Sequence, residues 1–158
     1  MKVVVQRVSE ASVSVSSRVV GKIDKGLLLL VSFTAGDNDD VIDWMVRKIS
    51  NLRIFDDESG VMNLSVLDDG GKILSISQFT LYADCKKGNR PSYINAMGGE
   101  EAVLLYDKFN DRLRKCGLET EEGIFGEDMK VSLINDGPVT IILEKWLLGG
   151  IVYGLYKG

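Results

Sequence analysis

The sequence contains no histidine in its 158 residues. Without an imidazole, the protein cannot use a Ser-His-Asp or Cys-His nucleophile, a histidine metal ligand or a histidine proton shuttle. Any catalysis must therefore come from carboxylates, hydroxyls, amines, backbone dipoles or the substrate itself.

Cysteine is also scarce, and the 19 Lys and Arg residues are outnumbered by 23 Asp and Glu residues. The two cysteines, Cys85 and Cys116, have neither the spacing of a metal site nor that of a disulfide framework, which favours a reducing, cytoplasmic location. The net charge is −4, so any RNA would have to be contacted through a local basic patch. No apolar run reaches membrane-spanning length, and we expect no membrane contact, metal or cofactor.

What is present is the pattern of a single α+β domain. Alternating and β-branched segments predict strands at residues 3–8, 11–15, 19–23, 27–33, 52–55, 61–67, 72–81 and on both sides of residues 137–138. The sequence Asp-Asp-Gly-Gly at 68–71 predicts a hairpin between two of them. Apolar residues at helical spacing predict two amphipathic helices, at about 40–50 and 100–116. We expect a β-rich, barrel-like or two-sheet body with two helices.

Gly137 and Pro138 interrupt a segment that otherwise has the pattern of a strand. Proline removes a backbone donor, and the chain has only two prolines. The pair must therefore form a bend, a bulge or the edge of a sheet. An X-Pro bond can also be cis at low cost, although an ordinary trans turn is the simpler interpretation.

Ser77, Gln78, Phe79 and Thr80 end an apolar strand. Alternation places Ser77 and Phe79 on one face and the other two on the opposite face. These polar groups either satisfy nearby backbone groups or point into a pocket. A hydroxyl without a neighbouring base is a weak nucleophile, whereas backbone N–H groups at Phe79 and Thr80 could hold an oxyanion without any titratable residue.

A loop directly after this strand combines positive charge with an aromatic ring. It contains Lys86, Lys87, Arg90 and Tyr93, which suit phosphate contacts and base stacking in tRNA. A solvated loop is the alternative. The acidic runs at 37–40 and 56–58 lack the spacing of a calcium loop, so we interpret them as a helix cap and a turn.

Two separated motifs resemble one protein family. The segment Ser-Gln-Phe-Thr-Leu at 77–81, followed by Gly-Asn-Arg-Pro-Ser at 88–92, and Asn-Asp-Gly-Pro-Val-Thr at 135–140 are similar to the paired motifs of the D-aminoacyl-tRNA deacylases, once called D-tyrosyl-tRNA deacylases. Residues 1–8, 52–55 and 62–63 also resemble that family. The resemblance covers roughly residues 1–144 in the same order and implies the deacylase-type fold.

The resemblance implies a homodimeric hydrolase that cleaves the ester between a D-amino acid and the 3′ end of tRNA. It also implies that Gly137-Pro138 is cis, enters the partner's active site and, together with Asn135 and Thr140, selects the chirality of the substrate. Backbone carbonyls held near Cα would leave no room for an L side chain. Glycine has no side chain, so we expect glycyl-tRNA to be hydrolysed as well.

Two mechanisms remain open at this stage. In the first, the 2′-OH of the terminal ribose helps activate water while the N–H groups of Phe79 and Thr80 hold the oxyanion. In the second, Thr80 is a covalent nucleophile. Alternative functions are an editing domain that removes a mischarged L-amino acid and a non-catalytic, dimeric nucleic-acid-binding module.

The C-terminal segment 145–158 differs from the rest of the chain. It is apolar, aromatic and glycine-rich, and it lies beyond the part that resembles the family. We expect it to be an extension appended to a deacylase domain at 1–144.

Overall fold

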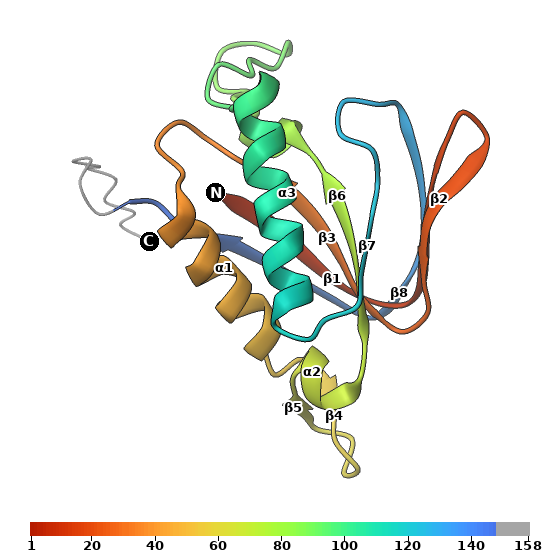
Figure 1. Ribbon diagram of the computed structural model, residues 1–158. Helices are drawn as coiled ribbons and strands as arrows, with labels where there is room; N and C mark the ends of the chain where they lie inside the picture. The colour runs from red at the N-terminus through yellow and green to blue at the C-terminus, as the bar shows by residue number, and fades with distance from the viewer. Residues whose placement is uncertain (148–158) are drawn as a thin grey trace.

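The computed structural model describes residues 1–147 and confirms an α+β fold (Figure 1). A main sheet of six strands curls into a nearly closed barrel, and two short strands form a second sheet. The strands are β1 (Lys2–Val15), β2 (Arg18–Ile23), β3 (Gly26–Ser32), β4 (Phe55–Asp56), β5 (Met62–Leu64), β6 (Lys72–Ser77), β7 (Thr120–Glu122) and β8 (Met129–Glu144). The helices are α1 (Asp39–Asn51), α2 (Val66–Asp69) and α3 (Gly99–Lys115), with a 3₁₀ turn at Phe79–Tyr82.

β1 organises the main sheet because it pairs with three other strands. Its first half pairs with β3, its second half pairs with β2, and β8 runs antiparallel along its whole length. β3, β6 and β7 are parallel neighbours. β2 curls over towards β7, since a Cβ added at Gly21 would lie 2.9 Å from the carbonyl oxygen of Glu122. That approach nearly closes the barrel.

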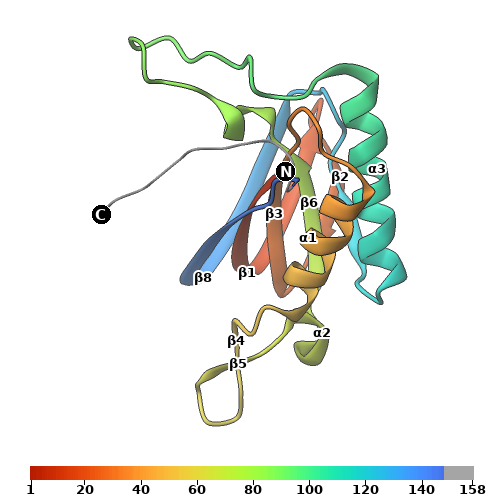
Figure 2. The same ribbon diagram turned by 90° about the vertical axis from the view of Figure 1, so that its left-hand side faces the viewer.

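α1 and α3 cover one face of this sheet (Figures 1 and 2). The apolar residues expected to form the inner side of α1 are all buried, namely Ile42, Met45, Val46 and Ile49. The side chain of Asn38 caps the start of α1 by accepting from the N–H of Val41. α3 buries most of its predicted stripe, but Cys116 is exposed. The buried core between the two helices and the sheet holds in place the end of the sheet at which the candidate site lies.

The predicted hairpin at residues 68–71 is wrong. Ser65 and Asp68 form a reciprocal capping box, which starts the short helix α2, and Gly70 ends it in the left-handed conformation. β5 therefore pairs with β4, and β6 pairs with β3 and β7 in parallel. The strand predicted at 52–55 shrinks to Phe55–Asp56.

The chain from Met129 to Glu144 forms one strand where two were predicted. Gly137 and Pro138 lie in a bulge of β8, between Asn135 opposite Val8 and Thr140 opposite Gln6. Within residues 1–147, β8 pairs only with β1, so the proline lies on an edge strand and removes no hydrogen bond from the sheet interior. The structure therefore confirms the prediction that this pair forms a bulge or lies at the edge of a sheet, and it does both.

The strand β8 ends at Glu144, where the C-terminal extension was expected to begin. Residues 148–158 of that extension lie outside the described part of the chain. Among the described helices, none is both long and apolar enough to cross a membrane.

Candidate active site

A pocket of about 270 Å³ opens at the carboxyl ends of the parallel strands β3 and β6. Val31 and Ile76 contribute apolar wall from these strands, Phe33 from just after β3, Phe125 from the chain between β7 and β8, and Met129 from the start of β8. Ser77, Gln78 and Phe79 line the same pocket. Three of the four residues predicted for catalysis are thus brought to one cavity.

The backbone leaves the strand just where this motif begins. β6 ends at Ser77, and the N–H of Gln78 donates to the carbonyl of Val31 at 2.7 Å. The 3₁₀ turn follows at once, so the predicted alternation of faces beyond Gln78 is wrong. Instead, the Gln78 side-chain amide donates to the Thr80 hydroxyl, which ties the two polar side chains together.

The N–H groups of Phe79 and Thr80 have no acceptor among residues 1–147. The adjacent donors do have one, because Gln78 N–H bonds to Val31 and Leu81 N–H bonds to Gln78. The ring of Phe79 is 53% exposed at the mouth of the pocket. Two neighbouring N–H groups are therefore available to a bound oxygen atom.

No side chain of the turn itself is suited to act as a base, whereas two carboxylates, Glu127 and Asp128, line the pocket from the chain between β7 and β8. The phenol of Tyr82 follows closely, but burial raises its pKa well above the usual value, and the nearby carboxylates of Asp37 and Glu144 raise it further. The Tyr82 hydroxyl is buried and has no hydrogen-bond partner in the described chain. It therefore stays protonated near neutral pH.

The basic loop is held beside the pocket by its aromatic residue. The ring of Tyr93 packs edge-on against Phe79, with 5.1 Å between the ring centroids. A reciprocal backbone pair between Asp84 and Ser92 closes the loop. The predicted phosphate-binding side chains, Lys86, Lys87 and Arg90, are all exposed and form no ion pair within residues 1–147.

The second motif lies elsewhere on the same chain. The Gly137-Pro138 peptide is cis, as the resemblance implied, and both residues are exposed. Neither residue lines the pocket beside Phe79, and the same is true of Asn135 and Thr140. The fold therefore separates the two motifs within a single subunit.

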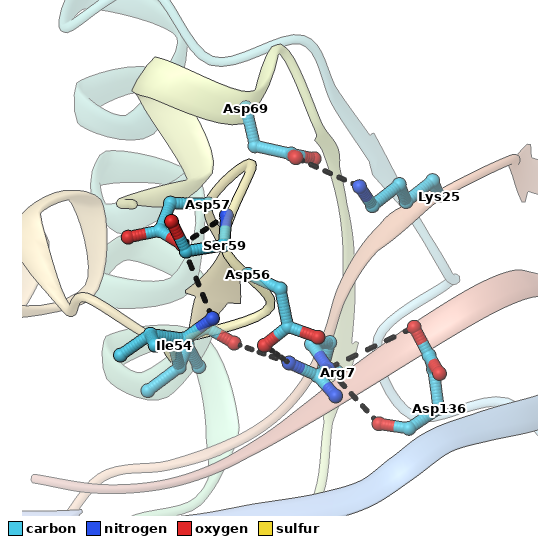
Figure 3. Close-up of polar contacts among 9 residues, drawn as sticks. Arg7, Lys25, Ile54, Asp56, Asp57, Ser59, Asp69 and Asp136 are labelled. Atoms are coloured by element: carbon cyan, nitrogen blue, oxygen red, sulfur yellow. Dashed lines mark hydrogen bonds and ion pairs between the residues drawn. The ribbon is translucent and has the colours of Figure 1, made fainter. Parts of the chain in front are cut away.

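Arg7 is a site residue that sequence reasoning missed. It is only 7% exposed, and its guanidinium donates to the carbonyl of Ile54 at 2.8 Å and to the carbonyl of Asp136 at 3.0 Å (Figure 3). The carboxylates of Asp56 and Asp136 lie 3.4 and 3.8 Å from its nitrogens. Arg7 thus ties the bulge of β8 to the chain before β4.

The packing around Gly137 is tight on the side of Arg7. Gly137 has φ +126°, and an added Cβ would lie 3.1 Å from Nη2 of Arg7 and 2.9 Å from Cγ2 of Val139. A side chain is therefore excluded both by backbone conformation and by space. The sequence did carry a signal for Arg7, because a cation takes the inward position after Val3 and Val5 in an alternating strand.

The two acidic runs have structural roles, one in a turn and the other at the start of a helix. Asp57 accepts from the N–H groups of Ser59 and Val61, and these bonds, the one from Val61 foremost, lower its pKa. Asp39 lies in the first turn of α1. Across residues 1–147, no group of three or more metal-ligating side chains of Cys, Asp or Glu comes together.

Proteins of similar sequence belong to the same family that the two motifs resemble. A family model described as D-Tyr-tRNA(Tyr) deacylase matches residues 4–144. The D-aminoacyl-tRNA deacylase of Brevibacillus brevis is 57% identical over 145 residues, which cover 92% of this chain and 100% of that protein. The D-aminoacyl-tRNA deacylase of Flavobacterium psychrophilum is 58% identical over 146 residues, covering 92% of this chain and 97% of its own.

Solved structures share the fold. A structure named c-Myc DNA Unwinding Element Binding Protein superposes with a TM-score of 0.87 at 44% identity, covering 93% of this chain and all of that chain. A probable eukaryotic D-amino acid tRNA deacylase superposes with a TM-score of 0.78 at 17% identity, over 90% of this chain and 97% of its own. The family match over nearly the whole described chain, with the relatives' identity, shows that this chain belongs to the D-Tyr-tRNA(Tyr) deacylase family.

Proposed function

We propose that this protein is a D-aminoacyl-tRNA deacylase, a hydrolase that cleaves the ester between a D-amino acid and the 3′ end of tRNA. Membership of the family supports this activity. The observation that carries it is the pair of available N–H groups at Phe79, which lines the pocket, and at the next residue, Thr80, in a protein without histidine. Such a site suits an ester, whose hydrolysis passes through an oxyanion.

The chemistry needs few groups from the protein. A water molecule attacks the ester carbonyl, the two N–H groups hold the resulting oxyanion, and collapse releases the amino acid and the 3′-OH of tRNA. The 2′-OH of the terminal ribose accepts the proton that the attacking water loses while its own proton passes to the departing 3′ oxygen, so the turn itself need not supply a base. The side chains of Ser77 and Gln78 shape the site, with Gln78 holding Thr80.

Chiral selection falls to Gly137 and Pro138, supplied by a second subunit. The pair is exposed, lies outside the pocket of its own chain and is held by Arg7. β8 also has an open edge within the described residues, with Ile134 53% and Ile142 67% exposed. These features support a homodimer in which each bulge enters the other pocket, with Asn135 and Thr140 flanking it.

The loop beside the pocket is assigned to the tRNA end. Lys86, Lys87 and Arg90 are placed to pair with phosphates near the 3′ terminus, and Tyr93 to stack on an unpaired base next to Phe79. The net charge of −4 makes such local patches necessary.

The function is tested by comparing three charged tRNAs under single-turnover conditions. We expect D-tyrosyl-tRNA to be hydrolysed, L-tyrosyl-tRNA to be spared, and glycyl-tRNA to be hydrolysed because it carries no L side chain to clash. Preferential hydrolysis of the L-form would instead indicate an editing domain. Strong rejection of glycyl-tRNA together with cleavage of the D-form would contradict steric selection.

Thr80→Ala separates the two mechanisms. If the Thr80 backbone rather than its hydroxyl acts, we expect kcat to fall by no more than about tenfold, from loss of the bond with Gln78. A covalent nucleophile would cost several orders of magnitude instead. The measurement is single-turnover hydrolysis of D-tyrosyl-tRNA, with Thr80→Ser as the matched variant and the melting temperature as a check on folding.

A binding module is the second candidate, and one observation favours it. The 44% identical structure is named for binding a DNA unwinding element. Filter binding of uncharged tRNA and of DNA, run beside the hydrolysis assay, tests this candidate. Binding without turnover of D-tyrosyl-tRNA would replace the deacylase proposal with the module.

A further inference from the structure

A hollow on the surface of α1 lies apart from the candidate active site. We call it the α1 groove; its volume is about 340 Å³. It is lined by Trp44, Arg47, Lys48, Asn51, Leu52 and Arg53. Three of these six side chains are cations and none is an anion, although the whole protein is acidic. The lining of the groove is therefore positively charged, although the protein as a whole is acidic.

Two of the three acidic residues of α1 are engaged on another side of the helix, and the third, Asp40, is exposed in its first turn. Asp39 pairs with Lys108 at 3.1 Å and with Arg112, and Asp43 pairs with Arg112 at 2.9 Å, so both face α3. Among residues 1–147, no carboxylate forms an ion pair with Arg47 or Lys48. Their positive charges are therefore available to a ligand.

Two lysine ammonium groups lie over the ring of Trp44 at one end of the groove. The Nζ atoms of Lys48 and Lys145 lie 5.5 and 5.3 Å from the centre of its ring. At the other end, the Arg53 guanidinium is held by the backbone and side-chain oxygens of Asn63. Lys48, Lys145 and Arg53 are thus held by partners that carry no negative charge.

A short series of contacts connects the Trp44 end to the active-site turn. The N–H of Lys145 donates to the carbonyl of Met1 at 3.0 Å. The next residue, Lys2, donates through Nζ to the carbonyl of Leu81 at 3.2 Å, and Leu81 directly follows Thr80. The groove therefore begins at the end of the sheet where the pocket opens.

We propose that the α1 groove binds the phosphate backbone of the tRNA acceptor strand when the aminoacylated 3′ end lies at Phe79 and Thr80. This proposal rests on the deacylase function proposed above. From Trp44 to Asn51 the helix rises by roughly 10 Å, at about 1.5 Å per residue. That length allows a few successive phosphates of one nucleic-acid strand to lie along the groove. Arg47, Lys48 and Arg53 supply one cation for each of these phosphates.

The test is a double variant, Arg47→Gln with Lys48→Gln, which removes two charges and keeps good helix formers. Arg53 is left intact because it holds Asn63. We expect kcat/KM for D-tyrosyl-tRNA to fall about tenfold at low salt, mainly through KM. The slope of log(kcat/KM) against log[salt] should become shallower by about two, one for each lost phosphate contact.

Two controls distinguish a tRNA contact from damage to the site. The D-tyrosyl ester of adenosine has no acceptor strand, so its hydrolysis should be unchanged in the double variant. Arg18→Gln with Lys115→Gln removes two exposed cations that lie outside the groove, and it should leave the salt slope unaltered. Melting temperatures of all proteins are compared.

An unchanged salt slope in the groove variant would overturn the proposal, and so would an equal loss with the adenosine ester. Affinity for uncharged tRNA gives an independent readout, expected to weaken in the groove variant only. If the unaltered protein hydrolysed neither substrate, the deacylase function would fail, whereas the tRNA affinities of the two variants would still decide the role of the groove.

Discussion

Arg7→Ala is expected to lower kcat/KM for D-tyrosyl-tRNA by about 10²-fold, because a displacement of about 1 Å in a positioning group can have that effect. The variant releases the carbonyl of Asp136, next to Gly137, and the carbonyl of Ile54 from the same guanidinium. The bulge that is proposed to exclude L side chains would then be free to move. Hydrolysis of L-tyrosyl-tRNA should rise relative to the D-form.

The ratio of D- to L-tyrosyl-tRNA hydrolysis is the decisive measurement. A buried acceptor left without a donor costs about 1–3 kcal/mol, so the variant should also melt at a lower temperature. Arg112→Ala is the matched control, since Arg112 also joins two segments of the chain but contacts Asp39 and Asp43 instead. Arg7→Lys keeps the charge without the planar fork and should restore selectivity only in part. A lower melting temperature with an unchanged D-to-L ratio would leave Arg7 a purely structural role.

Removing the 2′-OH from the terminal ribose of D-tyrosyl-tRNA is expected to reduce the single-turnover rate by about 10²–10⁴-fold, the usual contribution of a positioned proton acceptor. The reason is that the turn itself offers no base, because the chain has no histidine and the pKa of the Tyr82 phenol is raised further above neutral pH by burial. The substrate is expected to supply the group that the turn lacks, and cleavage of the deoxy form at the normal rate would point to the carboxylates that line the pocket, Glu127 and Asp128.

The measurement uses tRNA that ends in 2′-deoxyadenosine and is charged on its 3′-OH, with the uncatalysed rate subtracted for each ester. Competition against the normal substrate shows whether the deoxy form still binds. Tight binding with slow cleavage supports substrate assistance. Cleavage at the normal rate would contradict it and would require a protein group to activate the water.

The local elements follow largely from local sequence. The cap candidates at 37–40 before an amphipathic stretch predict α1, which Asn38 caps, and the apolar segment at 27–33 predicts a strand, which is β3. The hairpin prediction at 68–71 failed because the capping box of Ser65 and Asp68 stabilises a helix there. The capping box favours a helix, whereas the two glycines that follow favour a turn, and only tertiary packing decides between these structures.

The arrangement of the site depends on contacts between distant segments. The N–H of Gln78 meets Val31 because β3 and β6 pair in parallel, and Tyr93 meets Phe79 because the loop folds back over the turn. Arg7 contacts Asp136 across 129 residues of sequence. Short patterns carry no information about such pairs, so Arg7 could at most be noticed as a cation among inward-facing valines.

By itself, the sequence excluded histidine-dependent chemistry, and it identified both motifs through their resemblance to one family. The tertiary structure alone decided that these motifs lie apart on one subunit, that Arg7 holds the bulge of β8, and that Arg47 and Lys48 form no ion pair with any carboxylate of residues 1–147, whereas Asp39 and Asp43 face α3. The physical reason is that strand pairing and side-chain packing act over tens of residues, whereas composition and motifs describe only neighbours.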